Sequence, residues 1–333
     1  MARPQAYLFA LTLTVCVAAA ATHLPYAQQT STTVGPVAVT ATAVPMNPEN
    51  PSQREVGRFT YAGGLELTAA AGVRFGGLSD LDVDDKGQIL SVTDEGAWIS
   101  TALILDEGER LTGIAGVTSA PLAGLDGEPL RDKAVADAEG LASMPNGDRL
   151  VSFEREHRIW RYPSGGGRPV TVPTPPTADL PLNSGMEGLT SAPPLGRDVY
   201  LVGSEGGRIW LCGLATACRE TALGSFVPES FGLTGIAVSP DGSVLALATR
   251  AFDPSRGVRV RVRLLPRSAL DDRAAPPLDD LVLEAPLTRD NVEGLALRPG
   301  RNGSLRLYLL SDNNFSDTQH TYLLAFDWTA RAR

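Results

Sequence analysis

The stretch EGLALRPGRNGSLRLYLLSD, residues 293 to 312, is the last of five similar stretches in this sequence. Each stretch contains Gly-Leu or Gly-Ile, passes through a turn, and enters a second apolar run that ends near a charged residue. The other four are GGLSDLDVDDKGQILSVTDE (76–95), EGLASMPNGDRLVSFER (139–155), EGLTSAPPLGRDVYLVGSE (187–205) and TGIAVSPDGSVLALATR (234–250). Short apolar runs separated by Gly, Pro, Asn and Asp are typical of antiparallel strands. The sequence therefore predicts an all-β protein built from a repeated unit.

The spacing of the repeats predicts a β-propeller. Their glycines are 63, 48, 47 and 59 residues apart, at Gly77, Gly140, Gly188, Gly235 and Gly294. Periods of roughly 40 to 50 residues containing several strands are typical of propeller blades. Five repeats are visible, but residues 55–333 would hold about six such units, so six blades are favoured and five are the alternative. The unmatched strand near Tyr61 is expected to pair with the one near Leu323 and close the ring.

Two segments precede the predicted propeller domain of residues 55–333. Residues 1–27 combine Arg3 with a short apolar run and small residues, a pattern typical of a secretory signal peptide. A lipoprotein anchor at Cys16 is the alternative. Residues 28–54 are rich in Thr, Ala and Pro, which favours a disordered linker. We therefore expect a periplasmic or secreted protein that has no membrane contact after signal removal.

The two remaining cysteines, Cys212 and Cys218, are separated by six positions. In an oxidising compartment, this spacing suits a disulfide that closes a hairpin. Two free thiols are the alternative.

Composition narrows the functional classes. The formal net charge is -9 and no cluster of Lys or Arg occurs, which argues against binding to nucleic acid or to an anionic membrane. The sequence has no G-x-S-x-G, H-E-x-x-H or P-loop motif, and only three histidines. Oxygen ligands are plentiful, so a bound metal would be a hard cation such as Ca²⁺ or Mg²⁺. We expect a monomer that binds a small anionic substrate or ligand.

Two sets of charged residues recur at a fixed phase of the repeat. The first set directly precedes the repeat glycine and comprises Glu139, Glu187 and Glu293, with Thr234 and Gly76 in the other two repeats. The second set ends the second strand and comprises Asp94, Glu154, Glu205, Arg250 and Asp312. The first strand of each blade lines the central channel, so the three glutamates would converge and repel one another unless a cation neutralises them.

Two interpretations of these carboxylates remain open. In one, they form a Ca²⁺ site whose ligands are Glu139, Glu187, Glu293, Asp94, Glu205 and Asp312. In the other, each glutamate accepts backbone N–H groups of the adjacent blade, and the following glycine permits close approach of the strands.

Four segments resemble the bacterial family described as esterase-like activity of phytase. They are GLSDLDVDDKG, AEGLASMPNGDRLVSFER, LTGIAVSPDGSVLALATRAFDPSRGVRVRVRLL and NVEGLALRPGRNGSLRLYLLSDNNFSDTQHTYLLAFDW, and the resemblance covers residues 58–329. It implies a β-propeller similar to secreted phosphoesterases, with motif positions at Glu139, Glu187, Arg250, Glu293, Asp312 and Asn313. The first repeat departs from the pattern, because Gly76-Gly77 replaces Glu-Gly. Asp80 or Asp94 is expected to contribute in its place.

These features lead to two functional hypotheses. The first is a hydrolase of phosphoesters or other anionic esters that uses a channel-bound Ca²⁺. Its catalytic residues would be Glu187, Glu293 and Arg250, with a glutamate as general base. Arg250, Arg155 and Asn313 would bind the anionic substrate. The second hypothesis is a non-catalytic propeller that binds a ligand or a protein, because the propeller fold hosts many functions.

Overall fold

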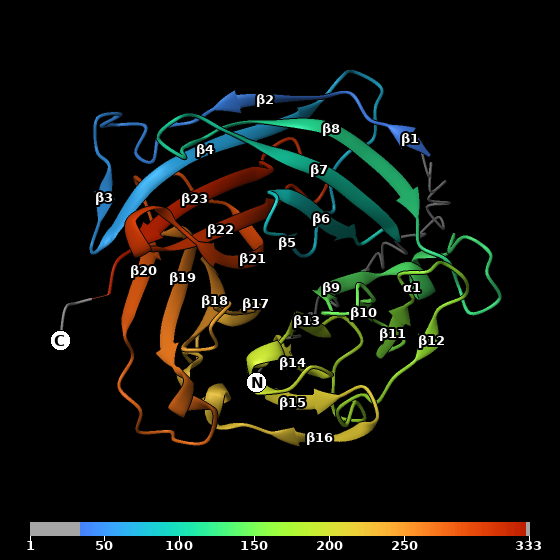
Figure 1. Ribbon diagram of the computed structural model, residues 1–333. Coiled ribbons are helices and arrows are strands. Elements are labelled where there is room, and N and C mark those ends of the chain that lie inside the picture. The colour runs from blue at the N-terminus through green and yellow to red at the C-terminus, as the bar shows by residue number, and fades with distance from the viewer. Residues whose placement is uncertain (1–33, 331–333) are drawn as a thin grey trace, which may run out of the picture.

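The computed structural model describes residues 34–330, and within this range the strands form five sheets around one axis (Figure 1). The innermost strands β5, β9, β13, β17 and β21 contact one another in a closed ring. Blade 1 contains β5 (Asp82–Val83), β6 (Gln88–Thr93), β7 (Ala97–Leu105) and β8 (Leu111–Pro121), with β1 (Gly35–Pro36) at its outer edge. Blade 2 contains β9 (Ala138–Ser143), β10 (Arg149–Phe153), β11 (Arg158–Tyr162) and β12 (Val170–Thr171).

The other three blades follow in chain order. Blade 3 contains β13 (Met186–Ser191), β14 (Val199–Ser204), β15 (Ile209–Gly213) and β16 (Thr216–Glu220). Blade 4 contains β17 (Gly232–Val238), β18 (Val244–Asp253), β19 (Gly257–Pro266) and β20 (Asp279–Leu283). Blade 5 contains β21 (Asn291–Pro299), β22 (Leu305–Asp312), β23 (Tyr322–Trp328), β4 (Phe59–Ala69), β2 (Val39–Ala43) and β3 (Glu55–Val56). The described helices are α1 (Lys133–Ala136) and short 3-10 turns at Pro193–Leu195, Ala222–Phe226, Arg267–Leu270 and Arg301–Gly303.

The propeller prediction is confirmed, and the number of blades is five, the alternative, and not the six that chain length favoured. Strand β4 does not begin a blade of its own. It pairs with β23, so that Tyr61 lies opposite Phe326 and Leu65 opposite Leu323, as expected for closure of the ring. Long strands such as β4, β7 and β8 use the residues that a sixth blade would have needed.

The predicted disordered linker of residues 28–54 does not hold for residues 34–54. Strand β2 extends the blade 5 sheet, with Val39 opposite Ala69, and β1 pairs with β8 of blade 1. Met46 is buried, and its carbonyl accepts a hydrogen bond from the Thr288 amide at 2.7 Å. An edge strand gains backbone hydrogen bonds from the sheet it joins, so it needs little apolar content of its own. Residues 1–33, with the predicted signal peptide, lie outside the described residues.

The repeat glycines let neighbouring inner strands pack closely. A Cβ atom on Gly188 would lie 2.7 Å from Ile236 Cγ1 of the next blade, and one on Gly294 would lie 2.7 Å from Leu81 Cβ. Both distances are shorter than any normal contact, so a side chain at either position would push the blades apart. The Gly-Leu and Gly-Ile pairs of the sequence are therefore the packing unit between adjacent blades.

Two further expectations concern covalent structure and the membrane. Cys212 of β15 and Cys218 of β16 form a disulfide that joins the two strands of a hairpin, as the spacing predicted. Among residues 34–330, no helix has the length and apolar character to cross a bilayer.

Candidate functional site

The charged residues gather at one end of the channel, where the innermost strands begin. Two cavities of about 200 and 150 Å³ lie there and share Glu139, Glu154, Asn183 and Glu293 in their walls. We call this region the charged mouth. Its residues are Ser79, Asp94, Lys133, Asp137, Glu139, Glu154, Arg155, Asn183, Glu187, Glu205, Thr234, Arg250, Glu293, Asp312 and Asn314. A separate cavity of about 820 Å³ occupies the opposite end of the channel.

Nearly all site residues proposed from the sequence line this mouth. The six proposed metal ligands are there, as are Arg250 and Arg155. Asn313 is the exception, because the wall residue is its neighbour Asn314. The Asn313 side chain accepts a hydrogen bond from the Phe315 amide at 3.0 Å and stabilises the turn between β22 and β23.

A β-bulge positions the residue that precedes each repeat glycine. In β13, Met186 pairs with Ser204 and Gly188 pairs with Gly203, so Glu187 is the extra residue between two ladder positions. The same shift in register occurs around Glu139, Thr234 and Glu293. A bulge leaves one residue outside the ladder and re-aims its side chain. The residue before each repeat glycine can therefore face the channel although its neighbours pack between blades.

In the first blade, the pattern of the other repeats occurs three residues after the Gly76-Gly77 pair. Leu81 packs against Gly294 of blade 5 just as Ile236 packs against Gly188, so Asp80 occupies the glycine position and Ser79 the glutamate position. The alignment of Gly76-Gly77 with the other Glu-Gly pairs was therefore wrong.

Asp80 and Asp94 have different roles in this blade. Both Asp80 oxygens accept backbone N–H groups at 2.7 Å, one from Leu81 and one from Leu141 of blade 2. Asp80 thus has the role that one interpretation assigned to the glutamates, since it accepts a backbone N–H group of the adjacent blade. Asp94 lines the mouth and accepts a hydrogen bond from Lys133 Nζ at 2.7 Å.

The charged mouth carries an excess of negative charge. Eight carboxylates line the two cavities, against Lys133, Arg155 and Arg250, which leaves five formal negative charges uncompensated. Lys133 and Arg155 both bind Asp137, at 2.9 and 2.5 Å. Arg250 lies on the other side, 3.0 Å from Glu293 Oε1 and 4.0 Å from Glu205 Oε1.

Three glutamates lie between these cationic flanks, and Glu139, Glu154 and Glu187 form no ion pair with any residue from 34 to 330. Burial, reinforced by the charge of Glu187, raises the pKa of Glu139 well above its usual range. Burial and the charge of Glu293 do the same to the pKa of Glu187. Burial, reinforced by Asp137, raises the pKa of Glu154 to about 7. Without a cation, this cluster therefore retains protons near neutral pH.

The flanking acids behave similarly. Burial raises the pKa of Glu293 to about 7 despite the nearby Arg250, and it raises that of Asp312 to about 6. Glu293 Oε1 also accepts a hydrogen bond from Asn291 at 2.7 Å. A divalent cation would replace the protons and favour the charged form of every carboxylate in the mouth.

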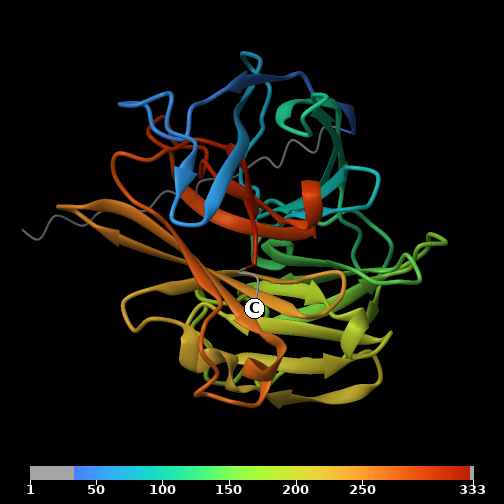
Figure 2. The same cartoon turned by 60° about the vertical axis from the view of Figure 1, so that its left-hand side comes forward.

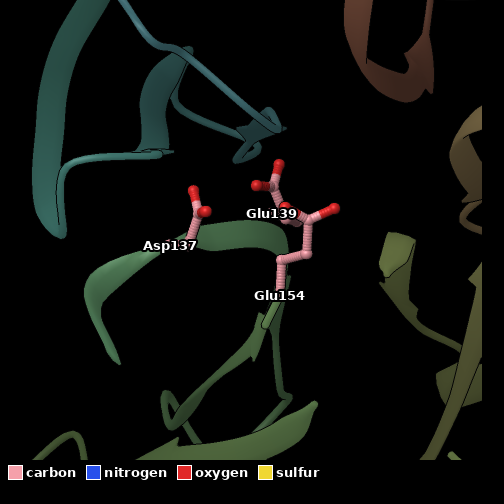
Figure 3. Close-up of side chains that lie close together, drawn as sticks. All are labelled: Asp137, Glu139 and Glu154. Atoms are coloured by element: carbon pink, nitrogen blue, oxygen red, sulfur yellow. The ribbon is translucent and has the colours of Figure 1, made fainter. Parts of the chain in front are cut away.

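The geometry suits a hard cation. Asp137, Glu139 and Glu154 each offer an oxygen, and the three oxygens lie within 4.8 Å of one another (Figure 3). Two buried oxygens of the mouth, Asp94 Oδ1 and Thr234 Oγ1, have no hydrogen-bond partner in the described part of the chain. Carboxylate and amide carbonyl oxygens are the ligands that Ca²⁺ prefers, and the mouth offers eight carboxylates and the Asn183 amide. The donor set therefore fits Ca²⁺, and neither a thiolate nor a histidine lines the mouth to favour a softer metal.

Five residues of the mouth were not predicted from the sequence, namely Ser79, Lys133, Asp137, Asn183 and Asn314. Asp137 and Lys133 belong to the segment around α1, and their spacing of four residues was the available signal for an ion pair on one helical turn. Asn183 comes from the loop before β13, and no local pattern marks it. Two wall residues also adopt the left-handed conformation that non-glycine residues seldom adopt, Arg155 with φ 60° and Asn314 with φ 47°. Such conformations concentrate at functional sites.

Several solved structures resemble this chain at low identity. A nidogen–laminin complex matches at 14% identity and TM-score 0.43, covering 77% of this chain and 85% of the other. The tail fibre of Staphylococcus aureus phage P68 matches at 11% identity and TM-score 0.39, covering 81% and 52%. Virginiamycin B lyase from Staphylococcus aureus matches at 15% identity and TM-score 0.39, covering 83% and 90%. These likenesses are too distant to bear on function.

A search of curated proteins found no match. The model of the family described as Phytase-like, esterase-like activity of phytase, matches residues 73–315. This range includes all five repeats up to the end of β22 and every residue of the charged mouth. The chain therefore belongs to the Phytase-like family.

Proposed function

We propose that the protein is a hydrolase of anionic esters, phosphoesters included, which works with Ca²⁺ at the charged mouth. Family membership supports a hydrolase-type function. The observation that carries the proposal is the unequal distribution of charge, with unpaired glutamates in the centre, Lys133 and Arg155 on one flank, and Arg250 on the other. A cation and an anion can bind next to each other in such a site. We also propose an exported monomer, a location with which the disulfide is compatible.

Each group has a distinct part in this proposal. Asp137, Glu139 and Glu154 would hold Ca²⁺, which supplies positive charge for a substrate oxygen and lowers the pKa of bound water. Arg250 binds the anionic group of the substrate through its guanidinium. Glu187 has no cationic partner in the described chain, and its Oε1 accepts a hydrogen bond from the Gly185 amide at 3.0 Å. This bond orients the carboxylate to take a proton from water as general base.

Glu293 serves a different purpose. Its Oε1 is bound by both Arg250 and Asn291, so it fixes the guanidinium at the edge of the cavity. His157 and His320 do not enter this chemistry. His157 Nε2 contacts the Pro181 carbonyl at 3.0 Å, and His320 Nδ1 lies 2.7 Å from Glu66, both outside the charged mouth.

The test begins with thermal unfolding of EDTA-treated protein. Ca²⁺ should raise the melting temperature by several degrees at about 100 times Kd, because it binds only the folded state. Glu139→Gln should abolish most of this response. Glu156→Gln is the matched control, because Glu156 is an exposed acid next to the mouth that does not line it.

Turnover of an anionic nitrophenyl ester then tests catalysis. Arg250→Ala should lower kcat/KM by at least about 100-fold while preserving the Ca²⁺ response, because the lost contact is a charge-assisted hydrogen bond. A melting curve that does not respond to Ca²⁺ would contradict the metal site. A Ca²⁺ response without turnover would instead support the alternative, a non-catalytic propeller that binds an anionic ligand or a protein.

A further inference from the structure

The hairpin of β18 and β19 extends beyond the rim of the charged mouth. The first residue of β17, Gly232, pairs with Arg250, but β18 continues to Asp253 before the chain turns and returns from Gly257. This projection is the orange hairpin at the left of Figure 2. It forms a wall beside the entrance to the smaller cavity, which Arg250 lines.

An exposed aromatic residue, Phe252, lies on the same face of this hairpin as Arg250. Arg250 pairs with Val260 and Phe252 pairs with Val258, without any shift of register between them. Residues two apart on a strand share one face and are about 7 Å apart along it. Phe252 is 71% exposed, although Val258 beside it packs against the core. The hairpin thus presents a cation and an apolar ring, side by side, at the entrance.

A second exposed apolar side chain directly precedes a residue of the charged mouth. Leu182 is also 71% exposed, and the next residue, Asn183, lines both cavities of the charged mouth. A single exposed apolar residue needs no explanation. Here two of the most exposed apolar side chains of residues 34–330 lie within two positions of residues that line the smaller cavity, Phe252 near Arg250 and Leu182 next to Asn183.

The charge distribution limits the ligand further. Lys133 and Arg155 are bound to Asp94 and Asp137, and Arg250 is bound to Glu293, so among the described residues the only guanidinium that lines the smaller cavity beside Glu187 is that of Arg250. A ligand that carries many anionic groups would bring them against an excess of carboxylates. A ligand with one anionic group and an adjacent apolar group would not.

From these observations, and on the basis of the proposed function, we infer that the site selects amphiphilic anionic esters. The anionic group binds Arg250, and an alkyl or aryl group of the same molecule contacts Phe252. A monoalkyl phosphate has this chemistry in its simplest form.

The inference is tested by calorimetric binding of methyl, butyl and octyl phosphate to the Ca²⁺-loaded protein, below micellar concentrations. Affinity should rise by about tenfold from methyl to octyl, because part of the chain is removed from water. Phe252→Ser should remove this dependence on chain length while methyl phosphate still binds, and Phe252→Leu should retain most of it. Leu278→Ser is the control, since Leu278 is an exposed apolar residue beside the outer strand β20 of the same blade.

Equal affinity for the three phosphates, or a dependence unchanged in Phe252→Ser, would overturn the inference. So would binding to anionic phospholipid vesicles with no preference among the soluble phosphates, because the apolar rim would then be a membrane contact. Absence of Ca²⁺-dependent hydrolysis bears on the proposed function alone, since chain-length preference is measured by binding.

Discussion

At the scale of single residues, the same position in different blades has different tasks. Glu139, Glu187 and Glu293 occupy the bulged position and face the channel, whereas Ser79 and Thr234 occupy it in the other blades. Blade 4 thus has no carboxylate in the ring, and it is also the blade whose second strand carries Arg250. Thr234 replaces a glutamate on β17, and Arg250 replaces an acid on the neighbouring strand β18. Arg250 is therefore the one cation among residues 34–330 that lines the smaller cavity.

Asp80 provides a residue-scale prediction. Its carboxylate binds the amides of Leu81 and Leu141, so Asp80→Ala leaves two buried N–H groups without an acceptor. We expect the free energy of unfolding to fall by about 2–4 kcal/mol, measured by urea denaturation. Asp85→Ala, an exposed acid of the same repeat, should change it by less than about 0.5 kcal/mol. Equal effects of the two substitutions would show that the hydrogen bonds of Asp80 to Leu81 and Leu141 do not stabilise the protein.

At the scale of elements, the inner strand of each blade combines packing and function within three residues. The residue before the glycine position faces the channel, the glycine of blades 2 to 5 (Asp80 in blade 1) adjoins the neighbouring blade, and the following Leu or Ile fills the space between blades. These last side chains are all buried in their blades, at Leu81, Leu141, Leu189, Ile236 and Leu295. The close packing of the strands in turn holds the glutamates near one another against their mutual repulsion.

The glycines give the prediction at this scale. Gly188→Ala would place a Cβ 2.7 Å from Ile236 Cγ1 and 3.1 Å from the Ile236 amide nitrogen, and the backbone cannot move aside cheaply. We expect a loss of about 1–3 kcal/mol in unfolding free energy. Gly165→Ala is the control, because no atom lies within 4 Å of the added Cβ. A Gly188→Ala protein as stable as the Gly165→Ala protein would show that the blades are not in tight contact there.

At the scale of the whole molecule, the ring is closed twice. Strand β4 joins the C-terminal β23 within blade 5, and the segment from residue 34 to 43 adds β1 to blade 1 and β2 to blade 5. The first described residues therefore bridge the two blades between which the ring closes. This closure keeps the inner strands in register, on which the geometry of the charged mouth depends.

The charged mouth makes stability of the whole molecule depend on pH. The pKa values of Glu154 and Glu293 are raised to about 7 and that of Asp312 to about 6, so the folded state binds more protons than the unfolded state between about pH 4.5 and 7. Stability from these groups is present at low pH and is lost as pH rises through their folded pKa values. The melting temperature of EDTA-treated protein should therefore fall from pH 5 to pH 8.

Two controls isolate this effect. Acids with lowered pKa, such as Asp241 and Asp253, lose their contribution only when pH falls below their ordinary range, so they do not act in this window. Glu154→Gln combined with Glu293→Gln should flatten the dependence, and saturating Ca²⁺ should reverse the loss at pH 8. A melting temperature that rises from pH 5 to pH 8 without metal would contradict the raised pKa values.

The sequence by itself determined the features that depend on local pattern. Alternation of apolar residues and turns indicated the strands, and recurrence of Glu-Gly-Leu indicated blades with glutamates on a common axis, because burial fixes the phase of a strand. The spacing of Cys212 and Cys218, together with the signal-peptide pattern that indicates an oxidising compartment, predicted their disulfide. The register of the first repeat could not be found in this way, since Asp80 stands where every other blade has glycine.

Only the tertiary structure decided the features that depend on contacts between distant segments. The number of blades is five because β4 joins the sheet of blade 5. Residues 34–54 are structured, contrary to the predicted linker, because β1 and β2 pair with the edges of existing sheets. Asp137 and Asn183 reach the mouth from loops whose path is set by the blades on either side. Such contacts join residues far apart in the chain, so their free energy depends on the folded ring and leaves no local periodicity in the sequence.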